Sequence, residues 1–260
     1  MSKNIQGYYS RYEPFTTEEL DHIYSAAKNG ILPDRRFIVF GQGRSGSSLL
    51  CSLLNSHSQI QCDGEMLKFQ VGDLHSYVDG ISKMSSLPNY GIKVKYYQIS
   101  KDQKRDPQEF LNHLHAEGWK ILHLRRKDNF RHAISGIISH RTGTYHTETK
   151  MPVRKITIGI PQLEETMKKR VRHYEEEVRL LENIPHKCIC YEDHLLKEDQ
   201  QQSTMNEVFD YLGLPKEAVA TSLVKIVKGD WKDFCENSDE IKRFLDQPST
   251  VRFIEQLSVN

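Results

Sequence analysis

Apolar residues recur along the chain with two different periods, and the two kinds of segment alternate. Short apolar or alternating runs with the pattern of β-strands occupy residues 37–40, 60–62, 90–99, 121–124 and 187–191. Segments with apolar residues at helical spacing lie between them, at 17–27, 47–54, 66–84, 107–116, 161–181, 206–212 and 239–259, and another helix is expected to begin near residue 129. This alternation predicts an α/β fold with a central, mainly parallel sheet flanked by helices.

The length of 260 residues suits one large domain with a substantial core. We expect a single domain over residues 1–260, with residues 1–34 as a helical lead-in and residues 35–260 as the core. Thr16-Thr17-Glu18-Glu19 can form a capping box that begins the lead-in helix. The candidate chemistry is therefore expected after residue 34.

The loop after the first core strand carries the strongest local signal. Gly41, Gly43 and Gly46 let the backbone turn tightly and bring its N–H groups towards an anion. Ser47 and Ser48 then occupy the first turn of a helix, where unpaired N–H groups favour a phosphate. The spacing from Gly41 to Gly46 is that of a nucleotide-binding P-loop, but Ser47 stands where that motif has its lysine.

The sequence Arg44-Ser45-Gly46-Ser47-Ser48 resembles the 5′-phosphosulfate loop of sulfotransferases. In that family a basic residue precedes a Ser/Thr-Gly-Ser/Thr-Ser/Thr sequence, which wraps the phosphosulfate of 3′-phosphoadenosine 5′-phosphosulfate (PAPS). The resemblance implies that these five residues bind PAPS. The alternative is a strand-to-helix turn that happens to be rich in glycine and serine.

A second basic segment, Arg125-Arg126-Lys127, follows the strand at 121–124, where side chains line the ligand crevice of an open α/β sheet. With Ser135 it resembles the 3′-phosphate motif of sulfotransferases. Its paired arginines match those of the bacterial branch that sulfates trehalose or nodulation oligosaccharides, and guanidinium groups suit phosphate geometry. The resemblance implies that Ser135 and one arginine, Arg126 in preference to Arg125, hold the 3′-phosphate. A solvated basic turn is the alternative.

Glu65 follows the strand at 60–62 and matches a glutamate that faces the acceptor in sulfotransferases acting on sugars and other small hydroxyl compounds. The resemblance implies that Glu65 is the catalytic base and that Arg44 stabilises the transferring group, since a nearby carboxylate can take the proton of the attacking hydroxyl. His57 and the later histidines are rivals of Glu65 for this role, and His57 is also a candidate acceptor contact. A solvated carboxylate or helix cap is the alternative for Glu65.

Other polar residues are assigned by position. Residues 139–159 match a segment that overlies the acceptor in that family, so Arg141, Tyr145 and His146 are candidate acceptor contacts, with a surface loop as the alternative. Lys228-Gly229 resembles the segment that closes over PAPS in animal cytosolic sulfotransferases, but it lacks the neighbouring arginine. Lys93 and Lys95 are expected on one side of their strand, facing solvent in preference to an anionic site.

Composition excludes several classes of protein. The 36 basic and 35 acidic residues leave a formal net charge of +1, which argues against a general nucleic-acid or anionic-membrane binder. The longest apolar runs are short of a membrane span and no signal-peptide pattern opens the chain, so a cytoplasmic protein is expected. The five cysteines lack zinc spacing, and we expect no metal.

Taken together, the two motifs imply a P-loop-like three-layer fold and a PAPS-dependent O-sulfotransferase acting on a small-molecule hydroxyl of a carbohydrate or secondary metabolite. A homodimer is possible in such a family. The sequence leaves two alternatives open: a nucleotide-dependent kinase or NTPase with a degenerate P-loop, and a PAPS- or nucleotide-binding protein without turnover.

Overall fold

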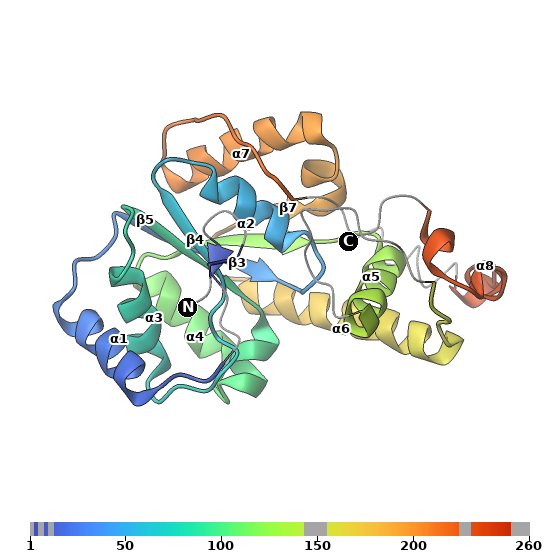
Figure 1. Ribbon diagram of the computed structural model, residues 1–260, viewed down its shortest axis with the longest axis horizontal. Helices are drawn as coiled ribbons and strands as arrows, with labels where there is room; N and C mark the ends of the chain where they lie inside the picture. The colour runs from blue at the N-terminus through green and yellow to red at the C-terminus, as the bar shows by residue number, and fades with distance from the viewer. Residues whose placement is uncertain (1–2, 5–7, 10–12, 143–154, 224–229, 251–260) are drawn as a thin grey trace.

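The computed structural model describes residues 3–4, 8–9, 13–142, 155–223 and 230–250 (Figure 1). Five parallel strands form a sheet in the order β4-β5-β3-β6-β7. These strands are β3 (Arg35–Gly41), β4 (Ile60–Glu65), β5 (Asn89–Val94), β6 (Lys120–Arg125) and β7 (His186–Cys190). A separate antiparallel pair joins β1 (Lys3–Asn4) and β2 (Tyr8–Tyr9). Because β3 is central, the loop that follows it lies in the middle of the edge where the strands end.

Helices cover both faces of the sheet, with α2 and α7 on one side and α1, α3, α4 and α6 on the other (Figure 1). The α-helices are α1 (Thr17–Asn29), α2 (Ser47–Asn55), α3 (Leu74–Lys83), α4 (Pro107–Ala116), α5 (Asn129–Thr142), α6 (Ile160–Leu181), α7 (Glu198–Leu212) and α8 (Ser238–Leu245). The predicted α/β class, a mainly parallel sheet flanked by helices, is confirmed.

Strand alternation explains why both faces are covered. Phe37 and Val39 of β3 pack in the core beneath α2 and α7, whereas Ile38 and Phe40 pack in the core shared with α3 and α4. Successive side chains of a strand point to opposite faces, so the apolar run of β3 can be buried only between two helical layers.

A third apolar cluster lies at one end of the molecule, where α5, α6 and α8 come together (Figure 1). Helix α6 connects this cluster to the sheet: Leu163 packs in the third cluster and Leu180 packs against the sheet core. A helix of 22 residues is about 33 Å long. Its middle turns therefore pass beside the edge at which β3 ends.

Several boundaries differ from those expected. The strand predicted over 90–99 ends at Val94 and is followed by a short π-helix, η1 (Gln98–Asp102). The helix predicted over 66–84 is confined to α3, and α7 begins eight residues earlier than expected, at Glu198. The Thr16 capping box forms as predicted, with Thr16 and Glu19 satisfying each other's backbone N–H groups.

Within the ranges that the structure describes, none of the helices combines the length and apolar character needed to cross a membrane.

Candidate functional site

The glycine-rich loop joins the end of β3 to the first turn of α2. Gly46 has a left-handed backbone, with φ at +92°, and a Cβ atom there would lie 2.4 Å from Cδ2 of Tyr191. Both the conformation and the space therefore require glycine. Arg44 also has a positive φ, of 71°, which is a strained conformation for a residue with a side chain and is often stored at functional sites.

Helix α2 begins with its N–H groups directed at the edge of the sheet. Its N-cap residue is Gly46, which has no side chain that could cap the first turn. The buried Ser45 hydroxyl donates to the Gln42 carbonyl oxygen at 2.6 Å, which closes the turn before the helix. A helix N-terminus after a glycine-rich turn is suited to an anion.

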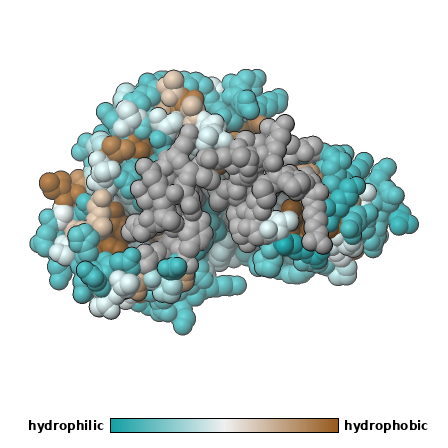
Figure 2. Space-filling view, viewed as in Figure 1, coloured by the Kyte–Doolittle hydropathy of each residue, from teal (hydrophilic) through white to brown (hydrophobic). Residues whose placement is uncertain are grey.

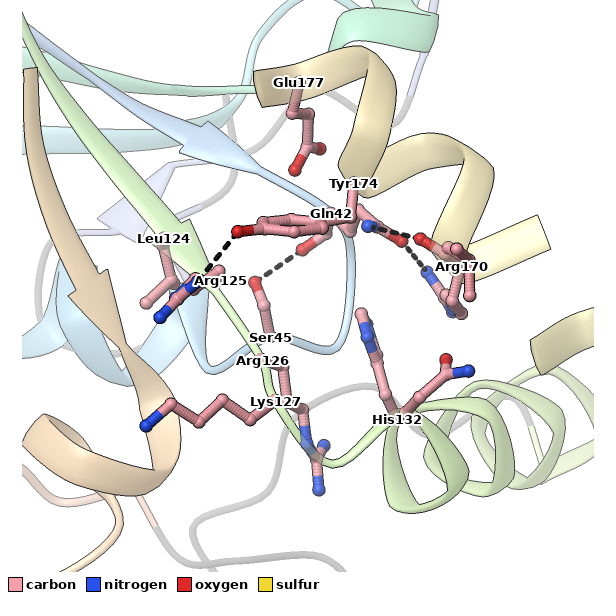
Figure 3. Close-up of a pocket in the computed structure, with 12 residues that line it drawn as sticks. Gln42, Ser45, Leu124, Arg125, Arg126, Lys127, His132, Arg170, Tyr174 and Glu177 are labelled. Carbon is pink, nitrogen blue, oxygen red and sulfur yellow. Dashed lines mark hydrogen bonds between the residues drawn. The ribbon is translucent and has the colours of Figure 1, made fainter. Parts of the chain in front are cut away.

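The two predicted phosphate-binding segments meet in space. Nε of Arg44 donates to the Ser135 hydroxyl on α5 at 3.2 Å, and a guanidinium nitrogen of Arg126 donates to the Arg44 carbonyl oxygen at 3.0 Å. Arg125 turns the other way and donates to the Tyr174 hydroxyl on α6 at 2.7 Å (Figure 3). Of the two arginines, Arg126 is therefore the one beside the loop.

Arg126 is held from a third segment, the π-helix η2 (Tyr191–Leu195) that follows β7. Its Nε lies 3.3 Å from a Glu192 carboxylate oxygen, and its guanidinium lies 5.1 Å from the centre of the Tyr191 ring. Glu192 also accepts from the backbone N–H of Lys127 at 2.9 Å. The turn at 191–195 therefore fixes the arginine that touches the loop.

Glu65 is the last residue of β4, and it is embedded in cations. Its carboxylate lies 3.0 Å from Nζ of Lys93 and 2.7 Å from Nζ of Lys95, both on or just after β5. The prediction that these lysines face solvent is wrong, because they are only 3% and 8% exposed and compensate a buried carboxylate. Burial by itself would raise the pKa of Glu65, but the charges of Lys93 and Lys95 outweigh it and lower the pKa well below its usual range.

This group of three, Glu65, Lys93 and Lys95, is called the β4–β5 flank, because it borders the loop on that side. A Cβ atom at Gly43 would lie 3.6 Å from both the Lys95 Nζ and the Tyr97 hydroxyl. Burial, followed by the charge of Glu65, raises the pKa of Tyr97 to about 12, so that the phenol stays protonated. The loop backbone, an ammonium and a phenol thus come together beside Glu65.

The opposite side of Gly43 is bordered by His132 on α5 and Arg170 on α6, called the α5–α6 flank. Both side chains reach the Gly43 carbonyl oxygen. They line a cavity of about 50 Å³, together with Gln42, Ser45, Tyr174 and Glu177 (Figure 3). Sequence reasoning missed both residues, because a single histidine or arginine within a helix carries no motif.

The candidate acceptor residues lie elsewhere or are not described. His57 precedes β4, at the sheet edge opposite Glu65; its Nε2 lies 3.0 Å from the Pro215 carbonyl oxygen and its ring packs edge-on against Phe209. The length of β4 separates His57 from Glu65, so the structure does not bring these two candidates together. The acceptor contact of His57 stays a prediction. Arg141, in the last turn of α5, donates to Gln162 at 2.9 Å and to the Thr157 carbonyl.

Tyr145, His146 and the Lys228-Gly229 segment lie outside the described residues. In the part of the chain that is described, no three His, Cys, Asp or Glu side chains are grouped so as to hold a metal ion. Whether the site works without a metal stays a prediction.

Figure 2 shows a predominantly hydrophilic surface on the face viewed, with apolar residues in separate small groups among the atoms that are coloured.

No family model matches the chain, and no curated protein matches it. Among solved structures, the chain is similar to mouse sulfotransferase SULT7A1 complexed with PAP, with 13% sequence identity and a TM-score of 0.44 over 93% of this chain and 96% of that one. A likeness this distant does not bear on function, which has to be argued from the residues of the site.

Proposed function

We propose that the protein is a PAPS-dependent sulfotransferase that transfers a sulfuryl group to a hydroxyl of a small molecule. The observation that carries the proposal is the contact between the two motifs: Ser135 and Arg126, which match the 3′-phosphate motif, both hydrogen bond to Arg44 of the 5′-phosphosulfate loop. The ends of β3 and β6 lie side by side because the two strands pair. What supports the proposal is that Arg126 and Ser135, out of the segment after β6, hydrogen bond to the loop arginine.

The donor set suits a ligand with two anionic groups, as on an adenosine that carries phosphate at two positions. The first turn of α2, with the Ser47 and Ser48 hydroxyls, offers N–H and O–H donors to one anionic group, and Gly46 leaves the backbone close to Tyr191. Arg126 and Ser135 offer donors for a second anionic group at the adjacent strand end. A planar guanidinium can donate two parallel hydrogen bonds to a phosphate.

PAPS would supply a sulfuryl group attached to a phosphate leaving group. The residues of this chain would provide the fixed positive field around it: Arg44, Ser45 and the N–H groups of Gly46, Ser47 and Ser48 stabilise charge on the transferring sulfuryl group and on the leaving phosphate. Lys95, which lies beside Gly43, adds a cation from the β4–β5 flank. In a P-loop the lysine at the position of Ser47 supplies a cation to the phosphates, and here the Lys95 ammonium would supply one instead.

Glu65 is the proposed base. The acceptor oxygen forms its bond to sulfur while the bond from sulfur to the phosphate oxygen breaks, and the acceptor proton passes to the Glu65 carboxylate. Because Lys93 and Lys95 keep Glu65 ionised, the carboxylate is available at any physiological pH. Its low pKa makes it a weak base, so it is suited to a hydroxyl that becomes acidic as the new bond forms.

The acceptor is proposed to be a carbohydrate or secondary-metabolite hydroxyl, on the strength of the match between Glu65 and the acceptor-facing glutamate of sulfotransferases with such substrates. The near balance of 36 basic and 35 acidic residues supports a small-molecule acceptor over a nucleic acid.

Two measurements test the proposal. Calorimetric titration without metal compares 3′-phosphoadenosine 5′-phosphate (PAP) with ADP, and we expect tight binding of PAP alone. Preference for ADP would favour a kinase or NTPase instead. The Arg44→Ala variant, with its fold intact by circular dichroism, should lose most turnover of PAPS. The control is Arg131→Ala, which should keep it, because Arg131 is an exposed residue of α5 paired with Asp128 just before the helix. Binding of PAP without turnover of any acceptor would favour a binding protein.

A further inference from the structure

We infer that His132 and Arg170 are positioning residues that fix the peptide between Gly43 and Arg44, so that its N–H faces the anion-binding side of the loop. The inference rests on the proposed function, because it concerns how the loop is shaped for the 5′-phosphosulfate. It adds two residues from α5 and α6 that match neither motif.

The contacts converge on one carbonyl oxygen. Nε2 of His132 lies 2.8 Å from the Gly43 oxygen, and a guanidinium nitrogen of Arg170 donates to the same oxygen at 3.2 Å. Arg170 and Gln42 are also joined reciprocally: the Gln42 amide donates to the Arg170 carbonyl at 3.0 Å and accepts from the Arg170 side chain at 3.4 Å (Figure 3). The start of the loop is thereby tied to the middle of a helix that is itself packed at both ends.

The histidine is a neutral donor in this arrangement. His132 is only 3% exposed, and burial, followed by the charges of Arg170 and Arg126, lowers its pKa well below the usual value. A neutral imidazole has one N–H, and a carbonyl partner at Nε2 requires that N–H to be there. Arg170 supplies the charged donor to the same oxygen.

Peptide geometry turns these contacts into a direction. A trans peptide is planar, with its C=O and N–H pointing to opposite sides, and the described chain has no cis peptide. If the Gly43 carbonyl points at α5 and α6, the Arg44 N–H points away from them. The next peptide is fixed in the same way. Arg126 donates to the Arg44 carbonyl oxygen at 3.0 Å, and the Ser45 N–H of that peptide therefore points away from Arg126.

The same contacts explain how Arg44 keeps its positive φ of 71°. Such a backbone conformation is strained for a residue with a side chain and persists only where the surroundings hold it. Carbonyl oxygens fixed on both sides of Arg44, by the α5–α6 flank and by Arg126, supply that constraint. Without the flank, the Gly43–Arg44 peptide is free to rotate to an unstrained conformation in which its N–H no longer faces the anion.

The test separates 5′-phosphate binding from general stability. Calorimetry measures the dissociation constants of PAP and 3′-AMP, two ligands that differ only in the 5′-phosphate. The dissociation constant of 3′-AMP divided by that of PAP gives the contribution of this phosphate to binding. We expect His132→Ala to reduce the ratio about tenfold with the affinity for 3′-AMP unchanged, and His132→Gln, which restores an N–H donor, to recover part of it. Arg170→Met should reduce the ratio as well, and Arg170→Lys should recover part of the loss.

Matched controls lie on the same helices. His140→Ala on α5 and Arg172→Met on α6 replace exposed side chains, the second paired only with Glu165 among the contacts described, and neither should change the ratio. Equal weakening of PAP and 3′-AMP by His132→Ala and Arg170→Met, or an unchanged ratio, would overturn the inference. If His132→Ala does not fold, the His132→Gln and Arg170 variants decide. Failure of the wild-type protein to bind PAP would instead overturn the proposed function.

Discussion

The two flanks of the glycine-rich loop use buried basic side chains in opposite ways. On the β4–β5 flank, Lys93 and Lys95 face the carboxylate of Glu65, and the three groups compensate one another. On the α5–α6 flank, His132 and Arg170 face a backbone carbonyl oxygen, which accepts hydrogen bonds but carries no charge. The partner of a buried basic side chain therefore decides what that side chain can do.

A carboxylate partner sets protonation, and a carbonyl partner sets geometry. The lysines keep Glu65 ionised at the price of its basicity, whereas His132 and Arg170 orient a peptide without neutralising the field around the loop. The carboxylates of the molecule show the same rule. Glu177, buried on α6 beside the cavity, has its pKa raised by burial, because Arg170 alone does not outweigh the loss of solvent.

The largest effect on turnover is expected from Glu65→Gln, which removes the charged carboxylate from the β4–β5 flank and with it the difference between the two flanks. We expect turnover to fall by a factor of about 10² to 10⁴, because the base is lost, while PAP binding persists. Two buried lysines are also left without a counter-charge, which should lower the free energy of unfolding by about 3 kcal/mol. Steady-state kinetics and urea unfolding measure the two effects; unchanged turnover would remove Glu65 as the base.

A smaller change is Lys95→Met, which leaves two cations near the Glu65 carboxylate: Lys93 at 3.0 Å and Lys68 at 3.8 Å. With one cation gone the pKa of Glu65 should rise towards its usual range, so the acidic limb of kcat/KM should move to higher pH. Loss of the ammonium beside Gly43 should also reduce kcat about tenfold. The pH profile is the measurement, with the exposed Lys101→Met as control. An acidic limb that stays in place would show that Lys95 does not control Glu65.

The smallest effect on activity is expected at Asp63, which lies on the same strand as Glu65. Burial raises its pKa to about 6, against hydrogen bonds from Tyr90 and Gln61 that lower it. Asp63 therefore holds a proton more tightly in the folded than in the unfolded protein. Its contribution to stability is fully present below about pH 4 and is lost as pH rises through about 6.

Asp63→Asn should remove that fall. We expect a gain of about 1–2 kcal/mol in the free energy of unfolding at pH 8, less than the full cost of the ionised group because Asn accepts more weakly from Tyr90. Urea unfolding between pH 4 and pH 8 measures it, with kcat unchanged. A variant less stable than wild type at pH 8 would show that ionised Asp63 is compensated in the folded protein.

Local patterns were enough to predict much of the fold. The apolar strand at 37–40, the glycine loop and the start of α2 at Ser47 appear where expected, because each depends on neighbouring residues. The capping box at Thr16 is similarly local. Where an apolar pattern continued past a strand or helix, as at 90–99 and 66–84, the predicted element was too long, because tertiary contacts decide where such a segment ends.

The residues of the site can likewise be divided into those that local sequence identifies and those that it does not. The loop and basic segment can be identified because residues adjacent in sequence form each of them, and Arg126, the preferred arginine of the segment, lies beside Arg44. The environment of Lys93 and Lys95 cannot be identified in this way, since alternation along a strand gives the face of a side chain but not the charge that meets it. His57 lies before β4, away from Glu65 at the end of that strand.

Backbone preference and periodicity within a few residues are therefore enough to specify the succession of strands and helices along the chain, the glycine-dependent loop and the two basic segments. The remaining contacts of the site arise only on folding: Arg44 meets Ser135, Glu65 lies between two lysines, and His132 and Arg170 share the Gly43 carbonyl. These contacts join residues that are distant in the chain. They depend on which strands lie side by side and on where α6 crosses the sheet edge, which no local pattern specifies.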